Sequence, residues 1–414
     1  MKYILIALLF ISFLNADEPD AVMKIEKNVD QRAKVTVIPS TDTTPKFAKE
    51  VNRLFKADFS VSGHFLVEDS NISKIDYSAL PVTINTNSEL TVIYKFKKTS
   101  TNGASLDIKV YKGSPKKQIL QKNYSVTRIE KAPFLIHKAV SEINALSKYP
   151  PIDWINRYVV LARYTGPKKT EILLADYTFT YQKVIIKGGF NMFPKWADKN
   201  QRELYYSNYG NKDNLVLYKV NIYTGAKQVV TKSKGMLICS DVSKDGSKLL
   251  LTMAPNSQPD IYLFSANQAK KLTNFSGIDV GGKFADGEQS VVFVSNRLGN
   301  PNIFKTSVNG GAVTQIVHHG TNNASVDAYE NQVVYSSKEG RGKFNIYLTD
   351  TNGEQTRPLT SGGVNQFPRF SSDGNVVMYI KRDGGENSIG FMNISSNRSE
   401  VFKMGISRIQ SIDW

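Results

Sequence analysis

Few residues of this chain could carry out chemistry, and none stands in a catalytic pattern. The sequence contains no G-x-S-x-G nucleophile elbow, no H-E-x-x-H motif and no paired C-x-x-C motif. Cys239 is the only cysteine and stands in the apolar run 236–239. A catalytic thiol needs a histidine partner, which the sequence does not place nearby, so we interpret Cys239 as a small hydrophobic residue.

Three short segments resemble ligand sites without completing them. His318 and His319 are adjacent, and neighbouring side chains on an extended chain point apart, which favours a solvated loop over a metal site. Residues 277–283 match the first part of a phosphate-binding loop, but Phe284 follows where Ser or Thr would bind Mg²⁺. Residues 350–353 begin like a calcium loop but lack its glutamate, so they predict a hairpin turn. We expect no cofactor and no metal.

The chain is basic, with 53 Lys and Arg against 37 Asp and Glu and a formal net charge of +16. Such a charge attracts anionic partners. No recognition helix or pattern of stacking aromatics accompanies it, so we interpret the lysines as solvated surface residues and expect no nucleic-acid partner.

The N-terminus predicts export. Lys2 precedes an apolar run over 3–14, and Ala16 offers a small residue for cleavage, so residues 1–16 are predicted to be a signal peptide. The alternative is an uncleaved anchor, but the run is short of the ~20 residues that span a bilayer. With one cysteine no intrachain disulfide can form.

The elements that must position any site repeat along the second half of the chain. Hydrophobic anchors recur at intervals of 42, 46, 42, 42, 44 and 44 residues; they are Trp154, Trp196, Val242, Phe284, Val326, Phe370 and Trp414. Periods of about 40–45 residues with several short strands are typical of propeller blades. Asp-Gly pairs at 245–246, 286–287 and 373–374 predict tight hairpins in the same phase.

Six intervals predict six blades over residues 148–414. Residues 412–414 (Ile-Asp-Trp) repeat residues 152–154, so we expect the last strand to join the first blade and close the ring. The fold class is therefore an all-β six-bladed β-propeller preceded by a small α/β domain.

That α/β domain is predicted over residues 34–147. Thr44-Pro45 predicts a helix start, and Phe47, Val51, Leu54 and Phe55 share one helical face. Strands are expected at 34–39, 59–67, 90–96, 105–111 and 119–126, and a second helix over 132–146 with an apolar stripe from Leu135 to Leu146.

The remaining candidate is a binding surface at one mouth of the propeller. The segments before each anchor should converge on one end of the channel, and several are unusually apolar. They are 148–151, 190–193, 236–239, 278–281, 320–323, 364–367 and 408–411. The predicted contacts are Phe190, Met192, Phe193, Met236, Ile238, Cys239, Val280, Asn322, Gln366 and Phe367. The alternative is that these side chains only fill the channel.

Several phrases resemble the TolB family, the periplasmic propeller component of the Tol-Pal envelope system. They are the segments 294–304 (VSNRLGNPNIF), 345–353 (NIYLTDTNG) and 367–374 (FPRFSSDG), and at the front Val29-Asp30 before Val37-Ile38-Pro39. The resemblance covers almost the whole mature chain.

The resemblance implies a periplasmic binding scaffold, a monomer that is peripheral to the outer membrane and peptidoglycan. One mouth of the propeller would bind the peptidoglycan-associated lipoprotein Pal, and bacteriocins in some relatives. A flexible segment over 17–33, with Met23, Ile25, Val29 and Asp30, would bind TolA. The system would support outer-membrane integrity and envelope constriction at cell division.

The alternative is a propeller-type periplasmic hydrolase. It would need a hydrolase domain after the propeller or a cage of carboxylates in the channel. The expected channel segments carry Asp279 but few other acids, and the chain ends where the ring closes, so we expect no enzyme.

Overall fold

The computed structural model describes residues 32–78, 86–99, 102–209, 214–406 and 408–414. Residues 33–414 form one compact unit. The predicted signal peptide lies outside the described residues. Among the helices of the described residues, none is long and apolar enough to cross a membrane.

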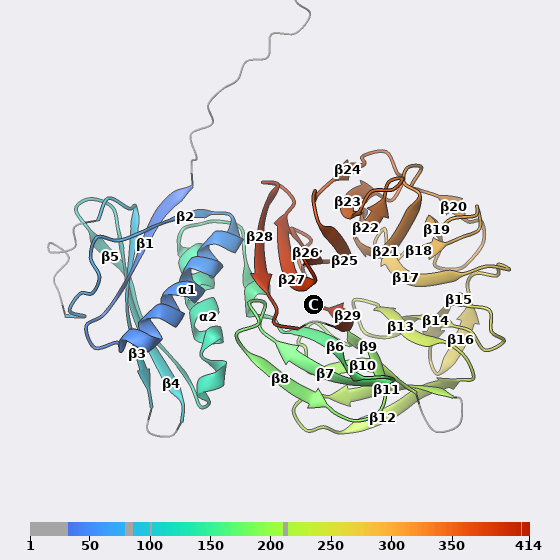
Figure 1. Ribbon diagram of the computed structural model, residues 1–414, viewed down its shortest axis with the longest axis horizontal. Helices are drawn as coiled ribbons and strands as arrows, with labels where there is room; N and C mark the ends of the chain where they lie inside the picture. The colour runs from blue at the N-terminus through green and yellow to red at the C-terminus, as the bar shows by residue number, and fades with distance from the viewer. Residues whose placement is uncertain (1–31, 79–85, 100–101, 210–213, 407) are drawn as a thin grey trace, which may run out of the picture. The chain divides into compact units, whose positions relative to one another are not determined.

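The first part of the described chain is the expected α/β structure (Figure 1). Its sheet has the order β2-β1-β3-β4-β5, with β1 parallel to β2 and β3 and the other pairs antiparallel. The bounds are β1 (Ala33–Pro39), β2 (Phe65–Glu68), β3 (Leu90–Lys98), β4 (Ala104–Lys112) and β5 (Lys117–Val126). Alternate residues of β3 and β4 are buried in one core with the helices α1 (Pro45–Ser62) and α2 (Pro133–Leu146), which therefore cover one face of the sheet.

Helix α1 begins and ends where its residue types allow. Thr44 is extended, Pro45 is the first helical residue, and Gly63 ends the helix with a φ of 75°. Two expectations here were wrong. Phe59 was predicted to begin a strand, but it lies inside α1, because it continues the helical face and stacks on Phe55 at 6.2 Å. Leu146 was placed on the buried stripe of the second helix, but it is half exposed at the last turn of α2.

The second part forms six four-stranded sheets around a centre (Figure 1), which confirms the six-bladed propeller. Each blade is an antiparallel meander, with its inner strand at the channel. The strands are β6 (Val159–Gly166), β7 (Lys169–Ala175), β8 (Gln182–Ile186), β9 (Asn191–Trp196), β10 (Glu203–Tyr209), β11 (Leu215–Asn221), β12 (Lys227–Ser233), β13 (Leu237–Val242), β14 (Lys248–Met253), β15 (Asp260–Ser265), β16 (Gln268–Lys271), β17 (Asp279–Ala285), β18 (Ser290–Ser295), β19 (Asn302–Ser307), β20 (Thr314–Gln315), β21 (Asn322–Tyr329), β22 (Gln332–Lys338), β23 (Phe344–Asp350), β24 (Arg357–Pro358), β25 (Val364–Phe370), β26 (Val376–Asp383), β27 (Glu386–Asn393), β28 (Arg398–Lys403) and β29 (Ile409–Asp413).

The ring closes as the sequence predicted. The last strand, β29, pairs antiparallel with β6 and is the inner strand of the first blade. Trp154 is not in a strand, as the repeat suggested, but in the short helix η3 (Asp153–Asn156). The place that Trp154 would take in the first blade belongs to Trp414, and the two indoles pack edge to face at 5.3 Å.

One anchor was assigned out of phase. In β17 and β25 the anchors Phe284 and Phe370 lie opposite Val291 and Val377. The residue in the same register of β21 is Ala328, opposite Val333, and not Val326. The sequence favours Val326 because valine is more hydrophobic than the alanine in phase; Val326 is also buried, at another position of β21.

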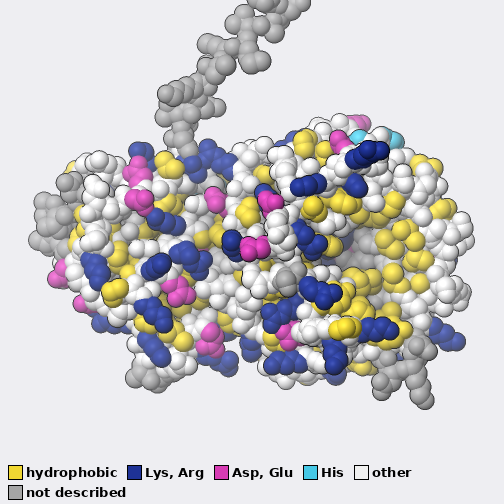
Figure 2. Space-filling view, in the orientation of Figure 1, with side chains coloured by type: hydrophobic (Ala, Val, Ile, Leu, Met, Phe, Trp, Pro, Cys, Tyr) yellow, Lys and Arg dark blue, Asp and Glu magenta, His cyan; other side chains and the backbone are white. Residues whose placement is uncertain are grey.

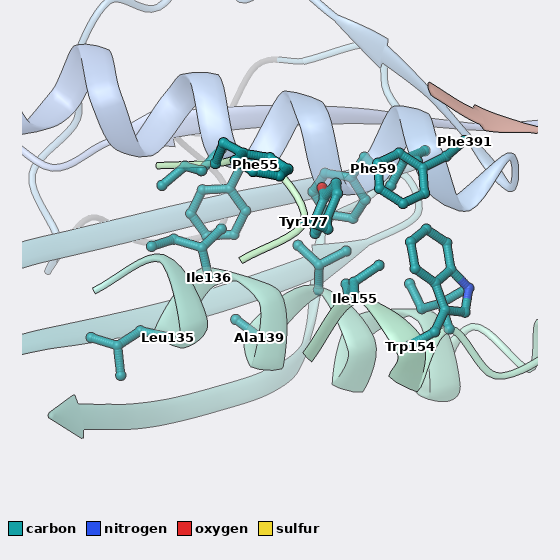
Figure 3. Close-up of a cluster of buried hydrophobic side chains, with 14 of the residues drawn as sticks. Phe55, Phe59, Leu135, Ile136, Ala139, Trp154, Ile155, Tyr177 and Phe391 are labelled. Carbon is teal, nitrogen blue, oxygen red and sulfur yellow. The ribbon is translucent and has the colours of Figure 1, made fainter. Parts of the chain in front are cut away.

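A shared hydrophobic core joins the α/β part to the propeller (Figure 3). Side chains of α1 and α2 lie against Tyr177 from the first blade and Phe391 from the sixth. Trp154 stacks on Phe391 with ring centroids 5.7 Å apart and meets Tyr177 edge to face at 5.9 Å.

A buried polar network crosses the same junction. His137 of α2 lies between Asp58 of α1, 2.9 Å from Nδ1, and Asp176 after β7, 3.3 Å from Nε2. Tyr177 donates a hydrogen bond to Asp58 at 2.5 Å, and the three charged side chains are fully buried. Burial disfavours the imidazolium, but Asp58 and Asp176 outweigh burial and raise the pKa of His137 to about 9. Burial raises the pKa of Asp58, whereas His137 and Thr178 outweigh burial and lower the pKa of Asp176.

Candidate functional site at the mouth of the propeller

All six inner strands carry a β-bulge or a similar break in register within the strand. In four of them a bulge residue has a positive φ: 52° at Phe193 and Ser325, 56° at Phe367 and 71° at Gly281. This conformation is uncommon for residues other than glycine, and rare for bulky ones. Bulges redirect side chains and often lie next to binding sites. These bulges therefore set the directions of the side chains at the end of the channel where the inner strands begin.

A pocket of about 230 Å³ opens at the bulges. Apolar side chains form most of its wall, including Phe193, Ile238, Val280 and Phe367. Charged side chains lie deeper, and three of them are cations: Lys195, Lys283 and Arg369. We call this site the mouth pocket.

The mouth pocket brings together five of the ten residues that the sequence proposed for this face. They are Phe193, Ile238, Cys239, Val280 and Phe367. Of the other five, Met236 is exposed beside the pocket, Met192 is buried within β9, and Phe190, Asn322 and Gln366 are half-buried outside its lining. The four residues proposed in the N-terminal segment, Met23, Ile25, Val29 and Asp30, lie outside the described residues.

One of the converging segments was misplaced. Residues 148–151 were expected at the mouth, but Tyr149 stacks on His64 at 5.0 Å and packs edge to face on Phe65, against the α/β part. The reason is the ring closure: β29 supplies the inner strand of the first blade, so the chain before β6 is free to pack elsewhere.

A ring of six charged residues, one from each blade, crosses the channel below the mouth pocket. Around the channel the charges alternate in sign, in the order Lys195, Asp241, Lys283, Asp327, Arg369 and Asp413. We call this set the channel ring. The channel ring was not predicted, because each member stands one residue before an anchor and the choice of Val326 as an anchor leaves Asp327 out of the pattern. When Ala328 is taken as the anchor of β21, the residue directly before the anchor of every blade's inner strand is charged.

Ion pairs link neighbours around the channel ring. Lys195 Nζ lies 3.0 Å from Asp413 and 3.4 Å from Asp241, and Lys283 Nζ lies 3.0 Å from Asp327. The guanidinium of Arg369 lies 3.7 Å from Asp413.

Each aspartate of the channel ring also holds the next blade. Asp241, Asp327 and Asp413 each accept the backbone N–H of the anchor that follows the neighbouring cation, at 2.9–3.0 Å. The anchors are Phe284, Phe370 and Trp196. These contacts give every carboxylate a backbone and a cationic partner, which a buried charge requires.

The pKa values of Lys195, Lys283 and Asp327 reflect burial and the charges close to each group. Burial opposes the charged form of Lys195, but Asp413 and Asp241 outweigh it and raise its pKa. Burial lowers the pKa of Lys283, which has one close carboxylate and repulsion from Lys195 and Arg369. Burial opposes ionisation of Asp327, but Lys283 and Arg369 lower its pKa.

The incomplete ligand motifs have structural roles. Residues 279–283 of the phosphate-loop look-alike belong to β17, and Lys283 joins the channel ring. His319 contacts the hydroxyl of Tyr335 at 2.6 Å and Glu339 at 3.1 Å. Asp350 accepts the backbone N–H groups of Asn352 and Glu354 in a turn. Within the described ranges, no group of three or more His, Cys, Asp or Glu could hold a metal ion.

Cys239 lines the mouth pocket without the features of a nucleophile. Burial raises the pKa of its thiol well above the ordinary value, so the thiolate is disfavoured at neutral pH. The arrangement as a whole is a concave, largely apolar surface over fixed charges, which suits binding of another molecule.

Comparisons with known proteins agree along the chain. A family model described as the TolB beta propeller domain matches residues 157–414. A protein of Wolinella succinogenes named "Tol-Pal system protein TolB" is 39% identical over 95% of this chain and 96% of its own length. A protein of the same name from Helicobacter hepaticus is 36% identical over 100% of both chains.

A solved structure shows the same fold. The crystal structure of TolB from Acinetobacter baumannii has a TM-score of 0.74 and 19% identity, covering 93% of this chain and 96% of that one. The family model spans more than half of this chain, and relatives more than 30% identical span nearly all of it. On this evidence the chain belongs to the TolB family of Tol-Pal system proteins.

Proposed function

We propose that the chain is a periplasmic protein-binding scaffold that holds the lipoprotein Pal at the mouth pocket and TolA through residues 17–33. In this role it supports outer-membrane integrity and envelope constriction at cell division. We also propose that the mature chain begins after Ala16, that residues 34–147 are the α/β domain and that residues 148–414 are the propeller.

The observation that carries the Pal assignment is the bulged wall of the mouth pocket. Phe193 and Phe367 keep a backbone conformation that is unfavourable for bulky residues, and both lie in the wall of the mouth pocket. A positive φ at a residue other than glycine is unfavourable, and such residues cluster at binding and active sites. The apolar wall with a polar floor has the composition of the buried centre of a protein interface.

A titration tests this assignment. The mature chain, residues 17–414, is titrated calorimetrically with the periplasmic domain of Pal from the same genome, and we expect saturable binding. Phe193→Asp should weaken the affinity at least tenfold, because a central apolar contact is replaced by a charge. The matched control is Val401→Asp, at an exposed site of β28, which should leave the affinity unchanged. Absence of saturable binding to the wild-type chain removes the Pal assignment.

The TolA assignment rests on the resemblance of the N-terminal segment to that of the TolB family. A short extended segment can add as a strand to the sheet edge of a partner, where backbone hydrogen bonds supply affinity. If occupancy of the mouth changes the availability of this segment, hydrogen exchange of residues 17–33 should differ with and without Pal. Unchanged protection would remove the coupling while leaving both binding sites in place.

A further inference from the structure

We infer that the partner enters the mouth pocket with a carboxylate side chain, Asp or Glu, flanked by apolar residues. The carboxylate would bind over Lys195, Lys283 and Arg369. This inference rests on the proposed function, because it assumes a protein partner at the mouth, and it adds the chemistry by which that partner is recognised.

The channel ring presents different charges to its two sides. All three cations line the mouth pocket, together with only one aspartate, Asp413. The pocket at the other end of the channel is lined by Lys195, Asp241 and Asp413, without Lys283 and Arg369. The six charges sum to zero, but the floor of the mouth pocket is cationic. An anion is therefore favoured on this side of the ring.

The aspartates of the channel ring have little accepting capacity left, whereas the cations retain donors. One oxygen of each aspartate accepts a backbone N–H, and the other faces a lysine. Arg369 donates from Nη1 to the carbonyl of Pro368, and its Nε, 3.7 Å from Asp413, makes no hydrogen bond among the described residues. A buried donor without an acceptor is unfavourable, and a carboxylate is the acceptor that a guanidinium binds best.

The size of the mouth pocket suits a side chain and not a folded element. Its volume of about 230 Å³ lies below the roughly 300–1,000 Å³ of typical small-molecule pockets. The apolar wall would exclude water around an inserted carboxylate, which strengthens its attraction to the cations. The same wall favours apolar neighbours on the partner.

The surroundings of the mouth also favour an acidic partner. Each inner strand begins at the mouth, and the antiparallel second strand of the blade ends there. The turns before the inner strands, and the turns between the second and third strands, therefore lie at the mouth. Among the described residues in and beside these turns, exposed cations outnumber the exposed carboxylates Glu339, Asp383 and Glu386; the cations are Lys168, Lys187, Lys232, Lys234, Arg341, Lys343, Arg382 and Arg408. Figure 2 shows a hollow in the propeller bordered by hydrophobic and basic side chains. Such a field speeds encounter with an acidic surface.

The first comparison of this test changes only the partner, so it does not depend on the folding of a variant of this chain. Each exposed Asp and Glu of the Pal periplasmic domain is replaced singly by Asn or Gln, and each variant is titrated against the mature chain. We expect one replacement to weaken binding at least tenfold. In the variant Arg369→Gln the same replacement should cost less than threefold, because the partner of the carboxylate is gone. If every replacement stays within twofold while Phe193→Asp still weakens binding, the inference is overturned and the proposed function stands.

A second arm does not depend on Pal. The probe is an acetylated and amidated peptide Leu-Phe-Glu-Phe-Leu, with its Gln counterpart as the control, measured by surface plasmon resonance on the immobilised mature chain. We expect the Glu peptide to bind at least fivefold more tightly and the preference to disappear in Arg369→Gln. Equal binding of the two peptides would overturn the inference, whether or not Pal binds.

Discussion

The junction network is the set Asp58, His137, Asp176 and Tyr177. Together with the channel ring it places nine charged or titratable side chains, besides Tyr177, in buried or half-buried positions. Lys283 is 3% exposed and Asp58, His137 and Asp176 are fully buried. A buried ion pair adds little net stability over an apolar pair of the same shape, but loss of one partner leaves an uncompensated charge. Single substitutions at these positions should therefore be far more damaging than at surface pairs.

The channel ring can be tested at Lys283. Lys283→Met leaves Asp327 buried without its closest cation, and we expect a loss of about 3–5 kcal/mol in the free energy of unfolding, measured by urea titration. The double variant Lys283→Met with Asp327→Asn keeps an acceptor for the N–H of Phe370 and should recover part of the loss.

The control for this experiment is Lys403→Met. Lys403 pairs with Glu386 at 3.1 Å, but both side chains are mostly exposed, so the change should be close to the error of the measurement. Equal stability of Lys283→Met and Lys403→Met would show that the channel ring does not hold the blades.

The junction network predicts a pH dependence. The pKa of His137 is raised from 6.5 to about 9 in the folded state, so the folded state holds its proton more tightly than the unfolded chain. The resulting stability is fully present below pH 6.5 and is lost as pH rises through 9. The maximum effect is on the order of 3 kcal/mol, from 1.36 kcal/mol per pKa unit. The raised pKa of Asp58 acts in the same direction, and the lowered pKa of Asp176 acts only at acidic pH.

Thermal unfolding between pH 6 and 9.5 measures this effect. The wild-type melting temperature should fall as pH rises, and His137→Gln should have a lower melting temperature with a flatter slope. His318→Gln, at an exposed histidine, should reproduce the wild-type slope. Parallel slopes for wild type and His137→Gln would exclude the network as the source.

At the scale of elements, the blades are built from equivalent turns whose surroundings differ. The first hairpins of the third and sixth blades contain Asp245-Gly246 and Asp373-Gly374, and both glycines have a φ of 74°. A Cβ at position 374 would lie 2.2 Å from the ring of Tyr329, whereas at position 246 the nearest atom would be 3.7 Å away. The two turns therefore have equal backbone strain and unequal space.

Glycine-to-alanine substitutions separate the two effects. Gly246→Ala should lose about 1 kcal/mol of unfolding free energy from the left-handed conformation alone. Gly374→Ala should lose clearly more, because the ring of Tyr329 or the turn must move. Denaturant unfolding of both variants measures the difference. Equal losses would mean that Tyr329 shifts without cost.

At the scale of the whole molecule, the α/β part and the propeller share one core. Trp154, Tyr177 and Phe391 lie in the same cluster as the side chains of α1 and α2 (Figure 3), and the junction network links both parts through His137. Unfolding of either part alone would expose the apolar side chains of this shared core to water, so it is unfavourable.

We therefore expect residues 33–414 to unfold in one transition. The tryptophans are Trp154, Trp196 and Trp414, so their fluorescence reports on the propeller and its junction. The α-helices α1 and α2 of the described chain lie in the α/β part, so circular dichroism at 222 nm reports mainly on that part. Melting curves from the two probes should coincide. Two separated midpoints would show that the shared core does not couple the parts.

The sequence by itself determined the architecture. The repeat of about 43 residues, the Asp-Gly turns and the echo of 152–154 in 412–414 predicted six blades and ring closure by the last strand. The repeat length and the turn residues can be recognised in the sequence, because each blade forms the same short strands and tight turns from residues close together in the chain. Short segments of the sequence also indicated the TolB family, and the comparisons with known proteins confirmed it.

Only the tertiary structure decided what the channel contains. Lys195 and Asp413 are 218 residues apart in the sequence, and nothing local shows that they form an ion pair at 3.0 Å. The sequence also could not show that His137 would lie between two carboxylates, since Asp58 and Asp176 come from a helix and a propeller turn. Closing the ring and packing the helices on the blade bring these groups together. Burial and charge pairing depend on that long-range packing, whereas strand period and turn type do not.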